Sequence, residues 1–150
     1  MDINYPPVGF HFKVEFQDLD KEGVDVRFQS VAGLSVDIQT ESFKEGGEHR
    51  FEHVLPVRTK YNNLVLKRGL VPKDSELAQW CMDTLTGNLE NTLETKMITV
   101  HLLEASRKPL KSWSFNNAWP VKWSVSDLNS MNNEIAIETL EFAYSNFQAR

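Results

Sequence analysis

Histidine and cysteine are the side chains of this sequence most able to bind a metal ion or act in catalysis. The histidines are His11, His49, His53 and His101. His49 and His53 have the i, i+4 spacing that joins two ligands on a helix, but they fall in a strand-like segment, where this spacing does not converge on a metal. Cys81 lies on the apolar stripe of a predicted helix, which favours a buried, inert thiol. We predict neither a metal site nor a cysteine nucleophile.

Glu45 and Glu48 flank Gly46-Gly47 and come closest to a catalytic carboxylate pair. On an exposed turn they lack the burial that separates the pKa values of an acid and a base. The glycine pair has neither the spacing nor the Lys-Ser/Thr of a phosphate-binding loop. These residues are therefore interpreted as a solvated or interface turn.

Three tryptophans, Trp113, Trp119 and Trp123, could stack a sugar or a base. They lie in strand-like segments beside small or polar residues, so core packing is the favoured interpretation. With no other constellation of reactive groups, we expect no cofactor and predict that the chain is not an enzyme.

Composition indicates one globular domain over residues 1–150, with 41% hydrophobic and 25% charged residues. The net charge of −5, without a cluster of Lys and Arg, argues against nucleic acid as the primary ligand. One cysteine excludes an internal disulfide. Asp2 and the lack of an apolar run before Pro6-Pro7 predict no cleaved leader. No run approaches the roughly 20 apolar residues of a membrane span, so we expect a soluble protein.

The stretch from Gln29 to Gly69 organises the rest of the chain. Two β-prone arms surround Glu-Gly-Gly-Glu, and glycine supplies the positive φ that a tight reversal needs. Arms this charged do not fit a core, so the spacing predicts a long hairpin that projects. A projecting hairpin has unpaired edges, which assemblies use to pair with a neighbour.

One helix is predicted from Ser75 to Thr86, with Asp74 or Ser75 as its N-cap and Gly87-Asn88 at its end. One side of it is mainly apolar, which places the helix on the outside of a sheet. That stripe consists of Leu77, Trp80, Cys81, Thr84 and Leu85.

Alternation of apolar and polar residues predicts about seven or eight strands. Phe10–Phe16 and Val24–Phe28 form an antiparallel pair, and the last strand changes phase between Ile137 and Leu140, which requires a bulge or bend. The fold class is mainly β, a curled antiparallel barrel or sandwich with one outer helix. Polar faces alternate with the core, and they meet either bulk water or a wet channel. They include Lys13, Glu15, Asp25, Arg27, Thr99, His101, Ser112 and Ser114.

Several segments together resemble the tail-tube family of contractile phages. They are YPPVGFHFKVEF, FQSVAGLSVDIQTESFKEGGE, LPVRTKYNNLVLKRGL, HLLEASRKPLKSWSFNNAWPVKWSVSDLNS and IAIETLEFAYSNF. The likeness is greatest to inner-tube subunits of extracellular contractile injection systems, which are phage-tail-like particles. It implies a fold similar to the haemolysin-coregulated protein of type VI secretion.

The resemblance also implies an assembly and the surfaces that build it. Six subunits would close a ring, rings would stack into a hollow tube, and contraction of a surrounding sheath would drive the tube through a target envelope. Further partners would be baseplate or tube-initiator proteins, a terminator or cap, and protein cargo. Assembly would take place in a bacterial cytoplasm, with the particle extracellular after release.

Particular residues acquire roles from this resemblance. The polar strand faces would line the lumen. A hairpin tip would reach the adjoining ring, an N-terminal arm would pack at a subunit junction, and the outer helix face would meet the sheath. These residues are Phe43, Lys44, Glu45, Gly46, Gly47, Glu48, His49 and Arg50 at the tip, Tyr5, Pro6, Pro7 and Val8 in the arm, and Glu76, Gln79 and Asp83 on the helix.

Two alternatives stay open from the sequence. The chain could build the tube of a phage virion or of a type VI system, which would differ in partners more than in fold. It could also be a monomeric β-barrel binding module that uses its tryptophans for a ligand.

Overall fold

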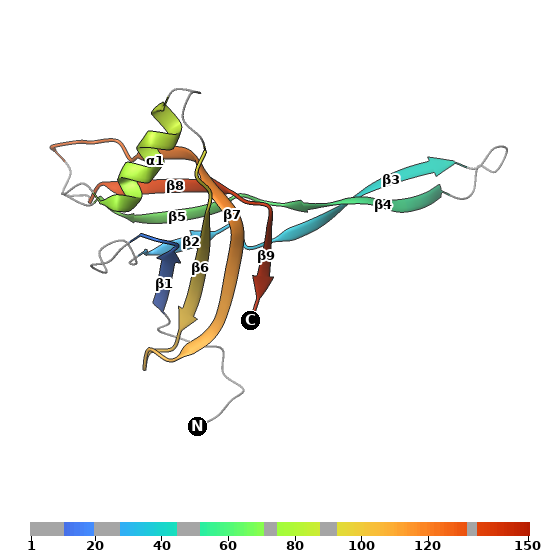
Figure 1. The fold of residues 1–150 in the computed structure, drawn as a ribbon, viewed down its shortest axis with the longest axis horizontal. Coiled ribbons are helices and arrows are strands. Elements are labelled where there is room, and N and C mark those ends of the chain that lie inside the picture. The colour runs from blue at the N-terminus through green and yellow to red at the C-terminus, as the bar shows by residue number, and fades with distance from the viewer. Residues whose placement is uncertain (1–10, 20–27, 45–51, 71–74, 88–92, 132–134) are drawn as a thin grey trace.

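The computed structural model describes residues 11–19, 28–44, 52–70, 75–87, 93–131 and 135–150. Within these ranges strands dominate and one helix accompanies them (Figure 1). The elements are β1 (His11–Phe16), β2 (Ser30–Ala32), β3 (Val36–Lys44), β4 (Glu52–Tyr61), β5 (Leu64–Gly69), α1 (Glu76–Thr86), β6 (Lys96–Leu103), β7 (Pro109–Val125), β8 (Ile137–Ala143) and β9 (Asn146–Ala149).

All strand pairs in the described ranges are antiparallel, as predicted. The main sheet follows the order β1-β6-β7-β8-β5-β2, β9 pairs with β7, and β3 and β4 form a separate ladder. β1 and β2 end the order without pairing with each other in the described part of the chain. The sheet is therefore curled and open there, and does not close into a barrel.

The long strand β7 joins the two halves of this sheet. Its first half pairs with β6 and β9, and its second half pairs with β8. Asn116 and Asn117 together oppose Met97, and Asn117 has a φ of 53°, a conformation that Asn tolerates better than most residues. Leu110 and Val121 are further extra residues, the first without a counterpart on β6 and the second without one on β8. These bulges let one strand serve two layers that run in different directions (Figure 1).

Two strand predictions need comment. The bulge expected in the last strand is wrong, because β8 keeps an unbroken register with β5 from Ile137 to Phe142. Its burial alternates throughout, and Ile135, 76% exposed, precedes it. The irregularity lies on the partner β7 instead. The expected partner of β1 lies outside the described residues except for Phe28, which is in no strand, and the described partner of β1 is β6.

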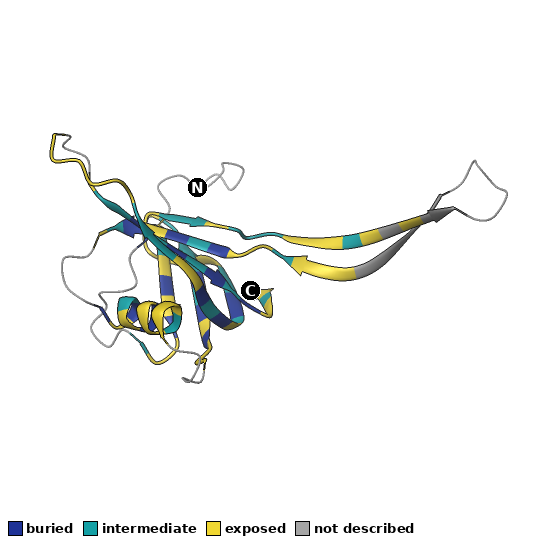
Figure 2. Cartoon of the chain, turned by 90° about the horizontal axis from the view of Figure 1, so that it is seen from above, coloured by how far each residue is buried: buried dark blue, intermediate teal, exposed yellow. Residues whose placement is uncertain are grey.

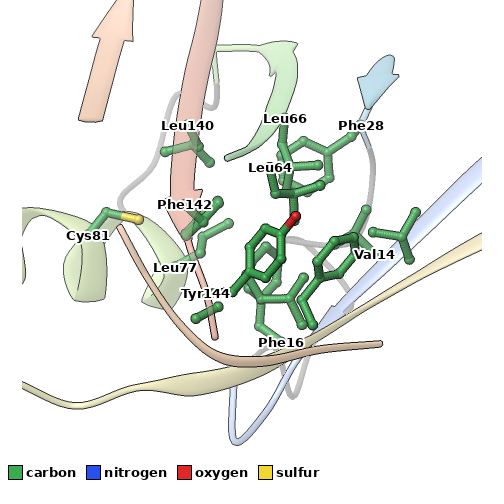
Figure 3. Packing of buried hydrophobic residues seen from close by; sticks show 14 of the residues in the cluster. Val14, Phe16, Phe28, Leu64, Leu66, Leu77, Cys81, Leu140, Phe142 and Tyr144 are labelled. Carbon is green, nitrogen blue, oxygen red and sulfur yellow. The ribbon is translucent and has the colours of Figure 1, made fainter. Parts of the chain in front are cut away.

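The core lies between the layers of the sheet and beneath α1. Aromatic rings link these elements: Phe142 stacks on Trp80 with ring centroids 5.9 Å apart, and Phe16 lies 5.8 Å from Phe142. Trp113 and Trp123 pack against the same cluster, which confirms the core interpretation for these two tryptophans. Figure 3 shows labelled members of the cluster: Val14, Phe16, Phe28, Leu64, Leu66, Leu77, Cys81, Leu140, Phe142 and Tyr144.

The helix begins where the sequence indicates. Ser75 is the N-cap and its hydroxyl accepts a hydrogen bond of 3.0 Å from the backbone N–H of Ala78. Leu77, Trp80 and Cys81 are buried, but Leu85 is 37% exposed. The buried stripe is therefore shorter than predicted, because Leu85 in the last turn of the helix lies outside the core.

A buried ion pair connects this helix to the sheet. Arg68 on β5 lies 3.1 Å from Glu138 on β8, and both side chains are almost fully buried. The guanidinium also donates to the Ser75 hydroxyl at 3.4 Å and lies over the Phe28 ring. Arg68 and Glu138 are also cross-strand neighbours in the β5–β8 register, and breaking such a buried pair is far more costly than losing an exposed one.

Substitution Trp80→Ala should lower the free energy of unfolding by about 3 to 5 kcal/mol, because it removes a large buried ring and its indole hydrogen bond to the Glu94 carbonyl. Urea denaturation of dispersed subunits measures this. Met82→Ala, on the exposed side of the same helix, is the matched control and should change stability by within about 0.5 kcal/mol. Equal effects of the two changes would contradict the packing described.

Candidate assembly interface

The β3–β4 hairpin extends well beyond the body of the molecule (Figures 1 and 2). Its register runs from Val36 opposite Tyr61 to Lys44 opposite Glu52, with one shift between Gln39 and Thr40. This confirms the predicted long projecting hairpin. In the described residues β3 and β4 pair only with each other. The outer backbone edge of each strand is therefore open to another chain.

The base of the hairpin has two unlike faces. Val36 and Ile38 are 49% and 61% exposed and share a face with Thr59. The opposite face has the cross-strand neighbours Asp37 and Lys60, and Arg58 donates a hydrogen bond to Gln39. An isolated two-stranded ribbon is at best marginally stable in water. An apolar stripe on such a ribbon indicates a surface that another molecule covers.

The root of the hairpin, where β3 and β4 join the body, is held by contacts among Gly33, Asn62, Asn63, Glu141 and Tyr144. The sequence did not show that these residues lie together. Gly33 has a φ of 92°, and a Cβ there would lie 1.9 Å from the backbone oxygen of Asn63. Tyr144 donates a hydrogen bond of 2.6 Å to the Asn62 carbonyl. Asn63 donates to Glu141 at 3.0 Å. The signal in the sequence was the Val-Ala-Gly-Leu kink together with Asn62-Asn63, but their pairing depends on contacts between distant segments.

The predicted contact residues are only partly described. Phe43 and Lys44 end strand β3. The tip residues Glu45, Gly46, Gly47, Glu48, His49 and Arg50 and the arm residues Tyr5, Pro6, Pro7 and Val8 lie outside the described residues. On α1, Glu76, Gln79 and Asp83 are exposed, and Gln79 donates to Asp83 at 3.0 Å. The structure thus places the helix trio on one open surface, apart from the hairpin (Figure 1).

Among the described residues, three strands of the main sheet also have an edge without a partner strand. In the described part of the chain β1 pairs only with β6, β2 only with β5 and β9 only with β7. The β2 ladder is short, from Ser30 to Ala32. Edges of this kind can continue a sheet into a second copy of the chain.

A polar sheet face runs across β1, β6 and β7, as the alternation predicts. Lys13, His101 and Ser112 form one row of cross-strand neighbours. Glu15 lies 3.1 Å from Lys13 and 3.5 Å from His101, and the His101 ring forms a hydrogen bond of 2.6 Å with Ser112. The charged groups on this face are therefore largely paired with one another.

The pKa of Glu15 reflects these neighbours. Partial burial acts to raise the pKa of this carboxyl, but the hydrogen bond and charge of Lys13, with the contribution of His101, bring it below its ordinary value. A lowered pKa in the folded state means that Glu15 stabilises the fold at pH values above the pKa of an unfolded glutamate, about 4.3. That stabilisation is lost as the pH falls through the lowered folded pKa.

The described residues offer little for chemistry. They contain no group of three or more His, Cys, Asp or Glu residues that could hold a metal ion. Cys81 is fully buried, which confirms that part of the prediction. His101 takes part in the polar sheet face. Of the helices in the described ranges, none has the length and hydrophobicity needed to cross a membrane.

Gly33→Ala should lower the stability of the subunit by about 2 to 3 kcal/mol, because alanine disfavours this φ and its methyl group would collide with the Asn63 carbonyl. Thermal unfolding measures the effect. Gly69→Ala is the matched control, since among the described residues a Cβ there meets only Ile135, at an ordinary 3.6 Å. If Gly33→Ala were as mild as Gly69→Ala, the described root would be wrong.

Glu15→Gln should make stability less sensitive to acid. Between about pH 6 and about pH 3, wild type should lose more stability than the variant, because only wild type loses a carboxylate held by Lys13 and His101. Urea midpoints recorded across this range test the difference. Parallel curves for both proteins would show that the carboxylate contributes nothing to folding.

Comparison with known proteins places this architecture in a family. The model of the T4-like virus tail tube protein gp19 family matches residues 8–148. No curated protein sequence matches the chain. Among solved structures, a chain of the anti-feeding prophage baseplate is 27% identical, with a TM-score of 0.81 over 99% of this chain and 97% of that chain.

Two other solved structures share the fold at lower identity. A chain of the PVC sheath-tube complex in its extended state is 23% identical, with a TM-score of 0.79 over 99% of this chain and 93% of that chain. Hcp1 from Flavobacterium johnsoniae is 16% identical, with a TM-score of 0.59 over 93% and 94%. The family match covers nearly the whole chain, and the open hairpin and sheet edges suit a tube subunit: this chain belongs to the T4-like tail tube protein family.

Proposed function

We propose that this chain is the structural subunit of the rigid inner tube of a contractile injection system. The observation that carries the proposal is the projecting β3–β4 ladder, which has open edges and an exposed apolar stripe within a tail tube family fold. Unpaired strand edges make a monomer prone to aggregation, but in an assembly their backbone groups can form hydrogen bonds with identical copies. The role is mechanical, and we assign no catalytic step to it.

Six copies close a ring in this proposal, and the rings stack into a hollow tube. The anti-feeding prophage chain that is 27% identical to this one comes from a baseplate structure with 6-fold symmetry applied. Open edges on β1, β2 and β9 give each subunit lateral pairing surfaces. A closed ring removes such edges, whereas the hairpin, which points away from the body, is free to contact the next ring.

The remaining surfaces receive roles by the same logic. The polar sheet face lines the lumen, where cargo would meet a hydrated surface whose charges are largely paired. Glu76, Gln79 and Asp83 on α1 face the sheath. The tip from Phe43 to Arg50 stacks rings, and the arm from Tyr5 to Val8 packs at a subunit junction. One tail tube domain over residues 1–150 supplies all of these surfaces.

The partners follow from the particles in which the similar chains occur. Those structures are a baseplate, a sheath-tube complex and a tube-terminating cap. We therefore propose a contractile sheath, baseplate proteins and a cap as neighbours, with assembly in a bacterial cytoplasm before release of the particle. The likeness to the anti-feeding prophage chain favours a phage-tail-like particle over a phage virion or a type VI tube.

Negative-stain microscopy of the purified protein tests the proposal. Rings, or stacks of rings, are expected at high concentration, with longer tubes when a baseplate initiator is added. A species that stays monomeric under both conditions would overturn the tube function and favour a monomeric binding module.

Replacing residues Glu45 to Glu48 with a short Gly-Ser turn should leave a folded, ring-forming subunit and shorten the tubes, because the replacement removes the proposed axial contact. Tube length distributions from micrographs give the result. The control is Glu76→Gln combined with Asp83→Asn on α1, which should leave the tube intact in the absence of a sheath. Tubes of wild-type length after the tip replacement would remove the hairpin tip from the stacking role.

A further inference from the structure

The connection between β7 and β8 carries a second exposed apolar surface. Leu128, Met131 and Ile135 are 76%, 89% and 76% exposed, more than any other large hydrophobic side chain among the described residues. Single exposed apolar residues are ordinary, but a group of them on one loop indicates an interaction site. We call Leu128, Met131 and Ile135 the loop patch.

Hydrogen bonds hold the described ends of the connection that carries the loop patch. Ser126 donates its backbone N–H to the Ile137 carbonyl at 2.8 Å, and its hydroxyl accepts from the Ile137 N–H at 2.9 Å. Leu70 donates to the Ala136 carbonyl at 2.9 Å, which ties the loop to the end of β5. Residues 126–130, 135 and 136 line a hollow of about 540 Å³. The side chains of the loop patch thus stay exposed although hydrogen bonds hold both ends of the connection.

The position of this loop identifies what can cover it. Figures 1 and 2 both place the β7–β8 connection at one end of the long axis of the molecule and the hairpin at the other. In head-to-tail stacking, a surface at one end of a copy meets a different surface at the other end of the next copy. If the next copy lies alongside the hairpin in the same orientation, the end of its body that carries the β7–β8 connection comes beside the base of that hairpin.

The base of the hairpin matches the loop patch in chemistry. Val36 and Ile38 form the exposed apolar stripe described above. The charged side chains of this part of the ribbon, Arg58, Lys60 and Asp37, lie on its opposite face and leave the stripe apolar. Contact between the stripe and the loop patch would remove both exposed apolar surfaces from water.

We infer that the loop patch of one copy docks on the Val36–Ile38 stripe of the next copy, so that the β7–β8 loop is the acceptor for the hairpin of the adjoining ring. This rests on the proposed tube function and deepens it by naming the receiving surface. The hairpin tip is not needed for this contact, which uses the base of the ribbon. Each subunit then contributes one donor and one acceptor, and the stack grows without a limit set by symmetry.

Substitution of the loop patch tests the inference. Leu128→Gln with Ile135→Gln should reduce mean tube length by about tenfold or more while rings persist, because two apolar side chains lose their burial in each contact. Met82→Gln with Leu85→Gln on α1 is the matched control and should leave tube length unchanged. Unchanged thermal unfolding of both variants confirms that the subunit itself is intact.

Crosslinking measures the contact directly. A chain carrying Ile38→Cys and Leu128→Cys, treated as assembled tubes with a short bis-maleimide, should give a ladder of covalent oligomers on a denaturing gel. Each single-cysteine variant should give no ladder, with the buried Cys81 as the shared background. The inference is overturned if the wild type forms tubes and the Leu128→Gln, Ile135→Gln variant forms tubes of the same length. It is also overturned if assembled tubes of the double-cysteine chain give no ladder. In both cases the tube function still stands. If wild type forms no tube, both the function and this contact are refuted.

Discussion

The open edges of the β3–β4 ladder are the constraint on which the rest of this structure depends. In an antiparallel pair each strand directs half of its backbone groups to its partner and half outward. No third strand meets either edge in the part of the chain that the structure describes, and Val36 and Ile38 lie exposed beside them. Two strands alone are marginal in water. The chain therefore carries an element that pairing with another copy would stabilise, as the proposed tube function requires.

The body of the fold gives this element a fixed direction. Gly33 allows the Asn63 carbonyl to approach closely, and Tyr144 anchors Asn62 from the aromatic cluster. The Tyr144 ring in turn packs at 4.9 Å from that of Phe115, and Tyr61 at the end of β4 lies 5.7 Å from Tyr144. Burial, with Tyr61 nearby, raises the pKa of Tyr144, so its hydroxyl stays a donor over the physiological range. The same contacts of Tyr144 therefore belong to the core and orient the hairpin that we propose as an assembly surface.

The sequence predicted what local pattern controls. Alternation located most strands, Ser75 marked the helix start, and the polar turn with two glycines marked a projecting hairpin. It failed where a contact joins distant segments. The bulges of β7 at Asn117 and Val121 arise because one strand serves two layers, and the exposure of Leu85 depends on how far the core extends along α1. The parts of the hairpin root were marked in the sequence, but their pairing could not be predicted for the same reason, since its hydrogen bonds span 78 positions from Asn63 to Glu141 and 82 from Asn62 to Tyr144.

A high-resolution reconstruction of the assembled particle tests the central claim most directly. The account predicts that the β3–β4 hairpin of each copy lies against a neighbouring copy, with its outer backbone groups or its apolar stripe covered by that neighbour. A map in which the hairpin folds back on its own body, with its edges closed by its own chain and no contact to another copy, would contradict it.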